Sequence, residues 1–205
     1  MSNDVLLNNQ KKGLTVKDLI ITGVFSAIII VGICLGGGVF AIMPALTFYY
    51  PAGAALLSGP VYLLMLAKAP KRGPVFIAGL LMAAFVFATG MHWAMAVGYL
   101  LGGIAADYTA GTQNYISKRM NLVSYIVFCL GGTGSYIAFF INPAVWVSGM
   151  LEKGTSREYL DTMQASAGWW VFAAMVVSTV LVALLSGFIG SKLLKKQFEK
   201  AGITA

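Results

Sequence analysis

The sequence predicts an all-α membrane protein, a bundle of six transmembrane helices with both termini in the cytoplasm. Apolar residues make up 59% of its 205 residues and charged residues only 10%. A soluble domain has roughly 45–50% apolar residues and about 25% charged residues. Six apolar stretches each approach the roughly 20 residues that a helix needs to cross a bilayer. Lysine and arginine gather on every second connection between these stretches, which sets a topology.

The six stretches define one membrane domain, residues 18–190, between a polar cytoplasmic lead at 1–17 and a basic cytoplasmic tail at 191–205. Ile33 makes a poor signal-peptide cleavage site, so the first stretch is expected to be retained as a helix. The predicted spans are residues 18–35, 49–67, 74–89, 92–110, 122–141 and 168–190.

The charge distribution predicts the orientation in the cell membrane. With an even number of spans, the predicted outer segments carry only Lys153 and Arg157. The predicted inner segments carry twelve basic residues, as the positive-inside rule requires of cytoplasmic segments: Lys11, Lys12, Lys17, Lys68, Lys71, Arg72, Lys118, Arg119, Lys192, Lys195, Lys196 and Lys200.

Local signals suggest where the elements begin and end. Thr15 or Asp18 can cap the first helix, and the glycine triplet 36–38 is expected to break it. Residues 36–48 then read as an outer loop across the mouth of the bundle. Pro60 lies inside the second span, so it predicts a kink, and a neighbouring helix must cover the carbonyl that it frees.

Three of the remaining connections are short. They are an inner turn at 68–74, an outer turn at Gly90 and a polar inner loop at 111–121. The segment 143–167 is the longest predicted outer loop, and loops of this length in compact domains are often lids or binding loops.

Small residues recur at four-residue spacing on three helices, among them the sixth span with Ala183 and Gly187, and such faces allow close helix packing in lipid. On the fourth span, Gly98 and Gly102 form such a face, for which internal packing is the favoured interpretation. On the first span, Gly23 and Ala27 form a shorter one. That face can pack internally or dock a second membrane protein.

Asp107 is the only acidic residue placed within a predicted span beyond its first residue. An ionisable group inside a membrane is a functional candidate. Two interpretations remain open, a structural or partner-contact role near the inner face and a role in proton or ion coupling.

Aromatic and polar residues gather at the predicted outer ends of the helices, and all four tryptophans are among them. An aromatic belt at the interface and a ligand pocket explain this group equally well. His92, the only histidine, can cap its helix or orient a ligand. The candidate substrate-binding residues, here called the outer rim, are Tyr49, Tyr50, His92, Trp93, Asn142, Trp146, Trp169 and Trp170.

Several function classes lack support in the sequence. The net charge of +7 is explained by topology and does not call for nucleic acid. Ser148 has no activating motif, one histidine provides poorly for metal chemistry, and the phosphate-binding G-x-x-x-x-G-K-[ST] pattern is absent. We therefore expect no enzyme activity, no metal and no cofactor.

Four stretches resemble the substrate-binding S components of energy-coupling factor (ECF) transporters, especially an MptD-like or Trep-Strep subgroup of integral membrane proteins. They are KGLTVKDLI at 12–20, GPVY at 59–62, GGIAAD at 102–107 and KLLKKQFEKAGI at 192–203. The resemblance covers nearly the whole chain and lies in the order of these stretches and the six-span layout.

The resemblance implies a protein that captures a vitamin-like micronutrient outside the cell and docks on a transmembrane coupling subunit driven by two cytoplasmic ATPases. Family members present alanines four apart on the first helix to that subunit, and Gly23 and Ala27 match them here. Family pockets lie at the outer side, beneath the first and the longest outer loops. The alternative function is a self-contained carrier or channel.

The predicted topology can be tested by labelling. A cysteine introduced near residue 150 is expected to react with a membrane-impermeant thiol reagent in intact cells, because the positive-inside rule places the 143–167 segment outside. Labelling only after the cells are broken open would contradict the orientation.

Overall fold

Helices account for the architecture of residues 13–200, the part of the chain that this computed structural model describes, and within it no strand occurs. A 3₁₀-helix, η1 (Pro44–Tyr49), joins the first two α-helices. The α-helices are α2 (Val16–Ala41), α3 (Tyr50–Lys68), α4 (Pro74–Ala88), α5 (Trp93–Gly111), α6 (Lys118–Gly131), α7 (Gly134–Ile141), α8 (Pro143–Glu152), α9 (Arg157–Ser166) and α10 (Trp169–Lys200).

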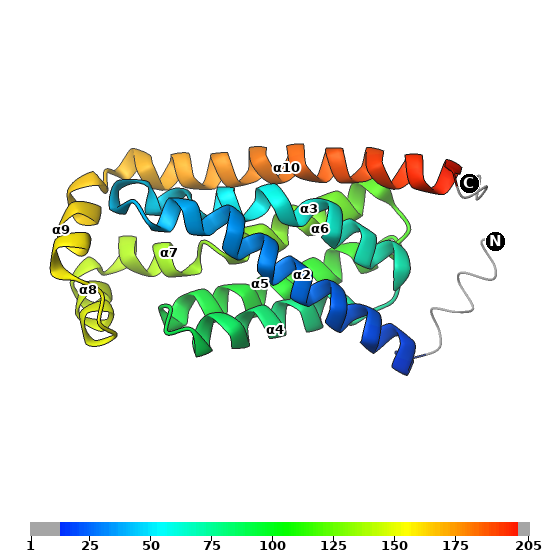
Figure 1. Cartoon of the computed structure of the whole chain (residues 1–205), viewed down its shortest axis with the longest axis horizontal. Helices are drawn as coiled ribbons and strands as arrows, with labels where there is room; N and C mark the ends of the chain where they lie inside the picture. The colour runs from blue at the N-terminus through cyan, green and yellow to red at the C-terminus, as the bar shows by residue number, and fades with distance from the viewer. Residues whose placement is uncertain (1–12, 201–205) are drawn as a thin grey trace.

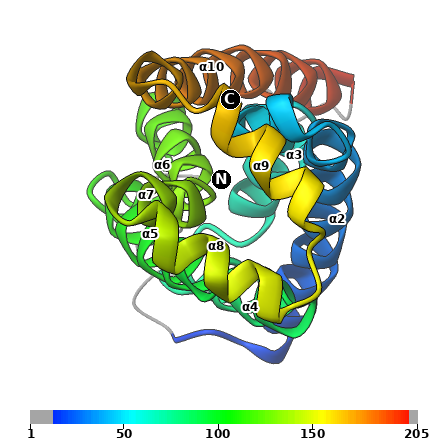
Figure 2. The same cartoon turned by 90° about the vertical axis from the view of Figure 1, so that its left-hand side faces the viewer.

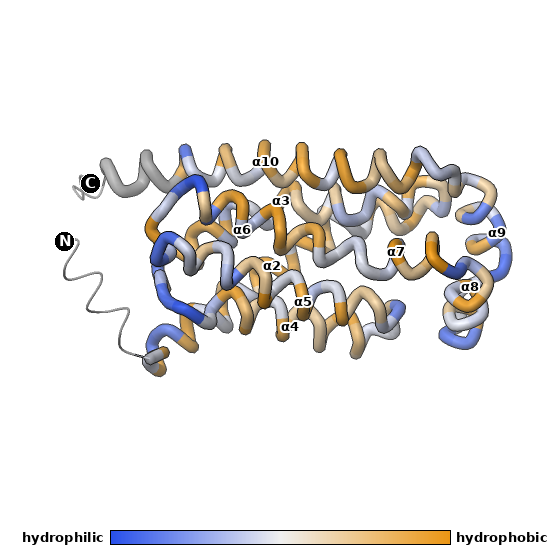
Figure 3. Tube along the Cα trace, turned by 180° about the vertical axis from the view of Figure 1, so that it is seen from behind, coloured by the Kyte–Doolittle hydropathy of each residue, from blue (hydrophilic) through white to orange (hydrophobic). Residues whose placement is uncertain are grey.

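The long helices run side by side along one axis (Figure 1). The start of α2, the end of α10 and the turns before α4 and α6 share one end, which we call the inner end. The short helices α8 and α9 cross the opposite, outer end (Figure 2). Hydrophobic residues fill the zone between two more hydrophilic ends (Figure 3), as a protein embedded in a bilayer requires.

Among residues 13–200, three helical segments are long and apolar enough to cross a membrane: Val16–Ala41, Pro44–Lys68 and Trp169–Leu193. The pair α6 and α7, bent by 47° at a short break, makes a fourth if it is one broken span. The all-α class is thus confirmed. The count of six spans and the cytoplasmic placement of the termini stay predictions.

The first helix begins as expected and ends later than expected. Thr15 and Asp18 form a reciprocal capping box, which confirms the predicted cap. The expected break at the 36–38 triplet was wrong, since α2 continues to Ala41. These glycines serve close packing instead: a Cβ on Gly36 would collide with the backbone of α3.

The two predicted outer loops are largely helical. Within 36–48, η1 follows α2 after a short bend, and within 143–167 the chain forms α8 and α9. The underside of α9 is anchored by Leu160 and Met163, which are fully buried. These segments close the outer end of the bundle, as the prediction of loops across its mouth implied.

Pro60 is accommodated as the sequence predicted. It cannot donate to the carbonyl of Leu56, and that carbonyl accepts a hydrogen bond of 2.7 Å from Ser186 Oγ on α10. The two helices meet closely here, because a Cβ on Gly190 would lie 2.8 Å from Pro60 Cα. A neighbouring helix therefore covers the freed carbonyl.

The face of α5 that carries Gly98 and Gly102 packs inside the bundle, which confirms the internal packing that the sequence favoured for it. A Cβ on Gly98 would collide with the carbonyl of Gly131, and one on Gly102 would lie 3.0 Å from Gly131 Cα. On the other side of α5, a Cβ on Gly103 would lie 2.9 Å from Gly79 Cα in α4. Glycine thus permits backbone contact on both sides of the helix.

Removing the hydroxyl that covers the Leu56 carbonyl should weaken the fold. We expect Ser186→Ala to lower the free energy of unfolding by about 1–2 kcal/mol, because a buried acceptor loses its donor. Thermal unfolding of the purified chain in detergent measures the change. Ser178→Ala is the control, since the Ser178 hydroxyl bonds only within its own helix. Equal shifts for both variants would contradict this role.

Candidate functional site

The outer end holds the candidate site, beneath a cover made by α8, α9 and η1 (Figure 2). Two hydrogen bonds to backbone carbonyls help to attach this cover to the bundle. Tyr159 in α9 donates a hydrogen bond of 2.7 Å to the carbonyl of Ala41 at the end of α2. Lys153 Nζ, after α8, donates to the carbonyl of Met91, which precedes α5.

Three of the outer-rim residues come together at the cover: His92 and Trp146 are buried, whereas Trp93 is 58% exposed. The rings of His92 and Trp146 stack with centroids 5.7 Å apart, and the ring of Trp93 lies 5.5 Å from His92. Trp146 is buried, and its indole Nε1 donates to Ser135 Oγ over 3.1 Å. His92 Nδ1 accepts from the amide of Ala94, so this histidine does cap α5.

Other outer-rim residues turn away from the interior. Trp169 is 85% exposed and Trp170 is 57% exposed, as residues of an interfacial aromatic belt would be. Asn142 is exposed, and its side-chain oxygen accepts from the amide of Val145 as the cap of α8. Tyr49 is half-buried in η1.

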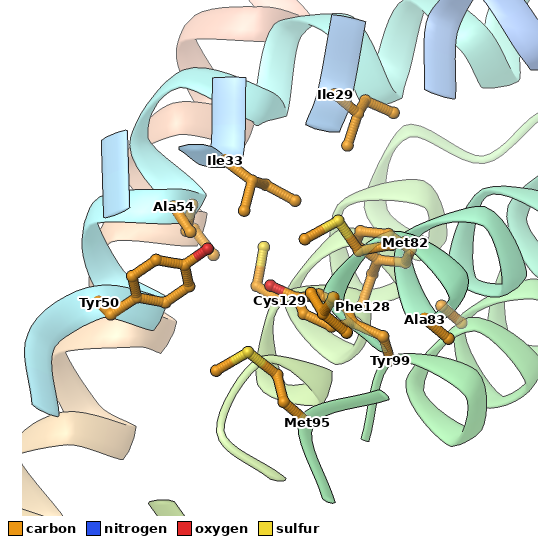
Figure 4. Close-up of a cluster of buried hydrophobic side chains, with 14 of the residues drawn as sticks. Ile29, Ile33, Tyr50, Ala54, Met82, Ala83, Met95, Tyr99, Phe128 and Cys129 are labelled. Atoms are coloured by element: carbon orange, nitrogen blue, oxygen red, sulfur yellow. The ribbon is translucent and has the colours of Figure 1, made fainter. Parts of the chain in front are cut away.

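Tyr50 points inward and marks a chamber that the sequence did not reveal. Its side chain is buried, and its hydroxyl has no hydrogen-bond partner in the described part of the chain. Figure 4 shows this hydroxyl directed toward Ile33 and Cys129, with Met82 and Met95 beside them. A buried hydroxyl without a partner is uncommon in native proteins, so this one indicates a place for a further molecule.

The chamber is a small, apolar cavity between α2, α3, α5 and α6. About 10 Å³ is open to the centre of a water molecule, which is room for roughly one water. A larger ligand would enter only if side chains or the cover moved. The chamber is lined by Ile33, Pro51, Ala54, Ala55, Ser58, Tyr99, Phe128 and Cys129.

The sequence could not have identified these lining residues. Ile33, Tyr99 and Phe128 occupy ordinary core positions of apolar helices, and Cys129 resembles a small packing residue. Only the crossing of four helices brings them to one cavity. The outer-rim prediction contained Tyr50, which lies next to this chamber, because an unusual pair of tyrosines begins its helix.

Asp107 lies at the opposite, inner end and holds the turn before α4. Its carboxylate oxygens accept from the amide of Gly73 at 3.1 and 3.2 Å, and one of them also accepts from the hydroxyl of Tyr115 at 3.3 Å. Burial and the nearby carboxylate raise the pKa of Tyr115, which keeps its hydroxyl protonated as a donor. This geometry favours the structural interpretation of Asp107.

The same turn is fixed a second time. Lys71 and Asp18 form a buried ion pair of 2.8 Å, which joins the turn to the first residues of α2. Because the Asp18 carboxylate also completes the capping box with Thr15, it serves both the helix start and the tertiary contact. Removing either charge would leave its partner buried and unpaired.

Comparison with known proteins agrees with this architecture. The family described as hypothetical bacterial integral membrane protein (Trep_Strep) matches residues 16–200. The chain belongs to the Trep_Strep family. No curated protein and no solved structure matches it.

Membership makes this Trep_Strep protein an integral membrane protein, as its apolar helices also indicate. Its matched region includes α2, the chamber helices and the cover. The Trep-Strep part of the resemblance drawn from the sequence is thereby confirmed. The wider relationship to ECF transporters stays a prediction.

The attachment of the cover can be tested by hydrogen exchange. Tyr159→Phe removes the hydrogen bond to Ala41. We expect this loss to lower the free energy of local opening by about 1 kcal/mol, so that the amides of α9 exchange about fivefold faster. Arg157→Ala is the control on the same helix, because its ion pair with Asp161 is exposed and contributes little. Unchanged α9 exchange in Tyr159→Phe would contradict the role of this bond.

Proposed function

We propose that this Trep_Strep protein is the substrate-capture component of an ECF-type importer. It binds a small, ring-bearing micronutrient at its outer end. It then delivers the molecule by docking on a transmembrane coupling subunit that works with two cytoplasmic ATPases.

The observation that carries the proposal is the open small-residue face of α2. Only 22% of the most apolar window of α2 is buried, against 67% for the Pro44–Lys68 segment. No atom lies within 4 Å of a Cβ built on Gly23, and Ala27 is exposed. These residues are therefore unused by the bundle, in contrast to Gly98 and Gly102 of α5. A second helix can approach closely at such a face in the bilayer.

The outer end supports the capture step. Tyr50 and the buried pair of His92 and Trp146 lie at the outer end, where α8, which carries Trp146, together with α9 and η1 can enclose a ligand. In the proposal, Tyr50 contacts the ligand directly, and His92 and Trp146 close the chamber beneath the cover.

The interior supports release through a partner rather than through a pore. Tyr62 and Tyr125 are fully buried, on the inner-end side of the chamber residues Ser58 and Phe128 of the same helices. The hydroxyl of Tyr62 shares a 2.6 Å hydrogen bond with Ser124, and Tyr125 shares one of 2.9 Å with Ser58. Because these side chains fill the space between helices, we propose that the whole bundle tilts in its complex to release the ligand inward.

Blocking the open face of α2 tests the proposal. We expect the double variant Gly23→Leu/Ala27→Leu to fold normally, since both sites face away from the bundle. The amount of coupling subunit and ATPases that co-purifies with it should fall by about tenfold or more. Gentle purification from the native host with quantitative mass spectrometry measures this. Ala173→Leu places a leucine on an exposed site of α10 and should retain the coupling subunit and the ATPases.

Two results would count against the importer. One is the absence of ATPase subunits from the wild-type preparation. The other is substrate uptake by the chain alone in proteoliposomes, which would favour a self-contained carrier.

A further inference from the structure

We infer that the chamber beside Tyr50 binds an uncharged, mainly apolar molecule whose polar group pairs with the Tyr50 hydroxyl. This inference rests on the proposed capture function and adds the chemical class of the ligand. It also moves the principal contacts from the tryptophans of the outer rim to the interior of the bundle.

The Tyr50 hydroxyl provides the first argument. It is one of three buried side-chain polar atoms that lack a hydrogen-bond partner in the described part of the chain, and the residue is only 3% exposed. Other buried tyrosine hydroxyls nearby are paired, for example Tyr136 with Thr47 and Tyr125 with Ser58. A ligand atom that accepts or donates one hydrogen bond would complete the pattern.

The chamber wall provides the second argument. Its lining consists of apolar side chains, two hydroxyl-bearing residues and the thiol of Cys129, without a carboxylate, ammonium, guanidinium or imidazole group. Ser58 is already bonded to the carbonyl of Ala54 and to Tyr125. A bound ion would lose its hydration and gain no counter-charge, so a charged ligand is disfavoured.

Two methionines explain how a closed chamber can admit a ring. Met82 and Met95 are buried in the same cluster, and Figure 4 shows both beside Cys129 and Tyr99. Methionine has three flexible torsions and adapts to irregular space better than branched residues do. Neither side chain lines the chamber itself, so their withdrawal would add space next to it without moving the helices.

Matched probes of one size test the charge preference. Benzamide, benzoate and benzylamine share a ring and differ in charge at pH 7. Their binding to the full chain in lipid nanodiscs can be measured by equilibrium dialysis. We expect benzamide to bind at least about tenfold more tightly than either charged probe, because neither ion finds a partner in the wall.

Variants locate the binding. Tyr50→Phe keeps the ring and removes the hydroxyl, so benzamide binding should weaken about five- to tenfold. Tyr108→Phe is the control, since Tyr108 is 74% exposed near the inner end. Met95→Ala removes bulk beside the chamber wall and should strengthen benzamide binding.

Each remaining outcome overturns the inference. Equal or tighter binding of a charged probe contradicts the ligand class, and an unchanged affinity in Tyr50→Phe contradicts the site. Failure of benzamide to bind both the wild type and Met95→Ala would leave the chamber as a water site. The importer is judged separately, because co-purification of the coupling subunit through α2 does not depend on the chamber.

Discussion

Close backbone contact between helices is the constraint on which the rest of this structure depends. Lipid supplies no hydrophobic force to drive helices together, so packing must do so. Glycines permit it where α2 meets α3, where α5 meets α4, and where α5 meets the α6–α7 break; a side chain on Gly36, Gly103 or Gly98 would strike the neighbouring backbone. These contacts set the helix positions, and the chamber near Tyr50 is the space left between them.

The second constraint is that polar backbone groups inside the bundle need partners. Pro60 frees a carbonyl, and Ser186 covers it from another helix. Ser124 bonds in the same way to the carbonyl of Ala106. Against this background of paired groups, the hydroxyl of Tyr50 is one of three exceptions in the described part of the chain, and each such exception calls for an explanation such as a bound water, ion or ligand.

The two ends of the molecule differ in construction. At the inner end, Asp18 and Asp107 fix one turn by an ion pair and by bonds to the Gly73 amide. At the outer end, the cover rests on buried residues of α9 and on hydrogen bonds from Tyr159 and Lys153. A rigid inner end beside α2 and a separately attached cover suit a protein that captures at one end and docks along one side.

The sequence by itself determined the membrane class, the approximate positions of the long helices, the charge asymmetry and the need to cover the carbonyl freed by Pro60, because hydropathy and proline chemistry are local properties. It also predicted that Gly98 and Gly102 of α5 pack against neighbouring helices inside the bundle. Which aromatic residues face inward was decided by the tertiary structure. Trp169 and Trp146 look alike in sequence, yet one is exposed and the other is stacked on His92. The helices of the cover have local signals, the caps Asn142 and Ser156, but their placement over the bundle and the chamber itself arise from contacts between segments far apart in the chain, which no local pattern encodes.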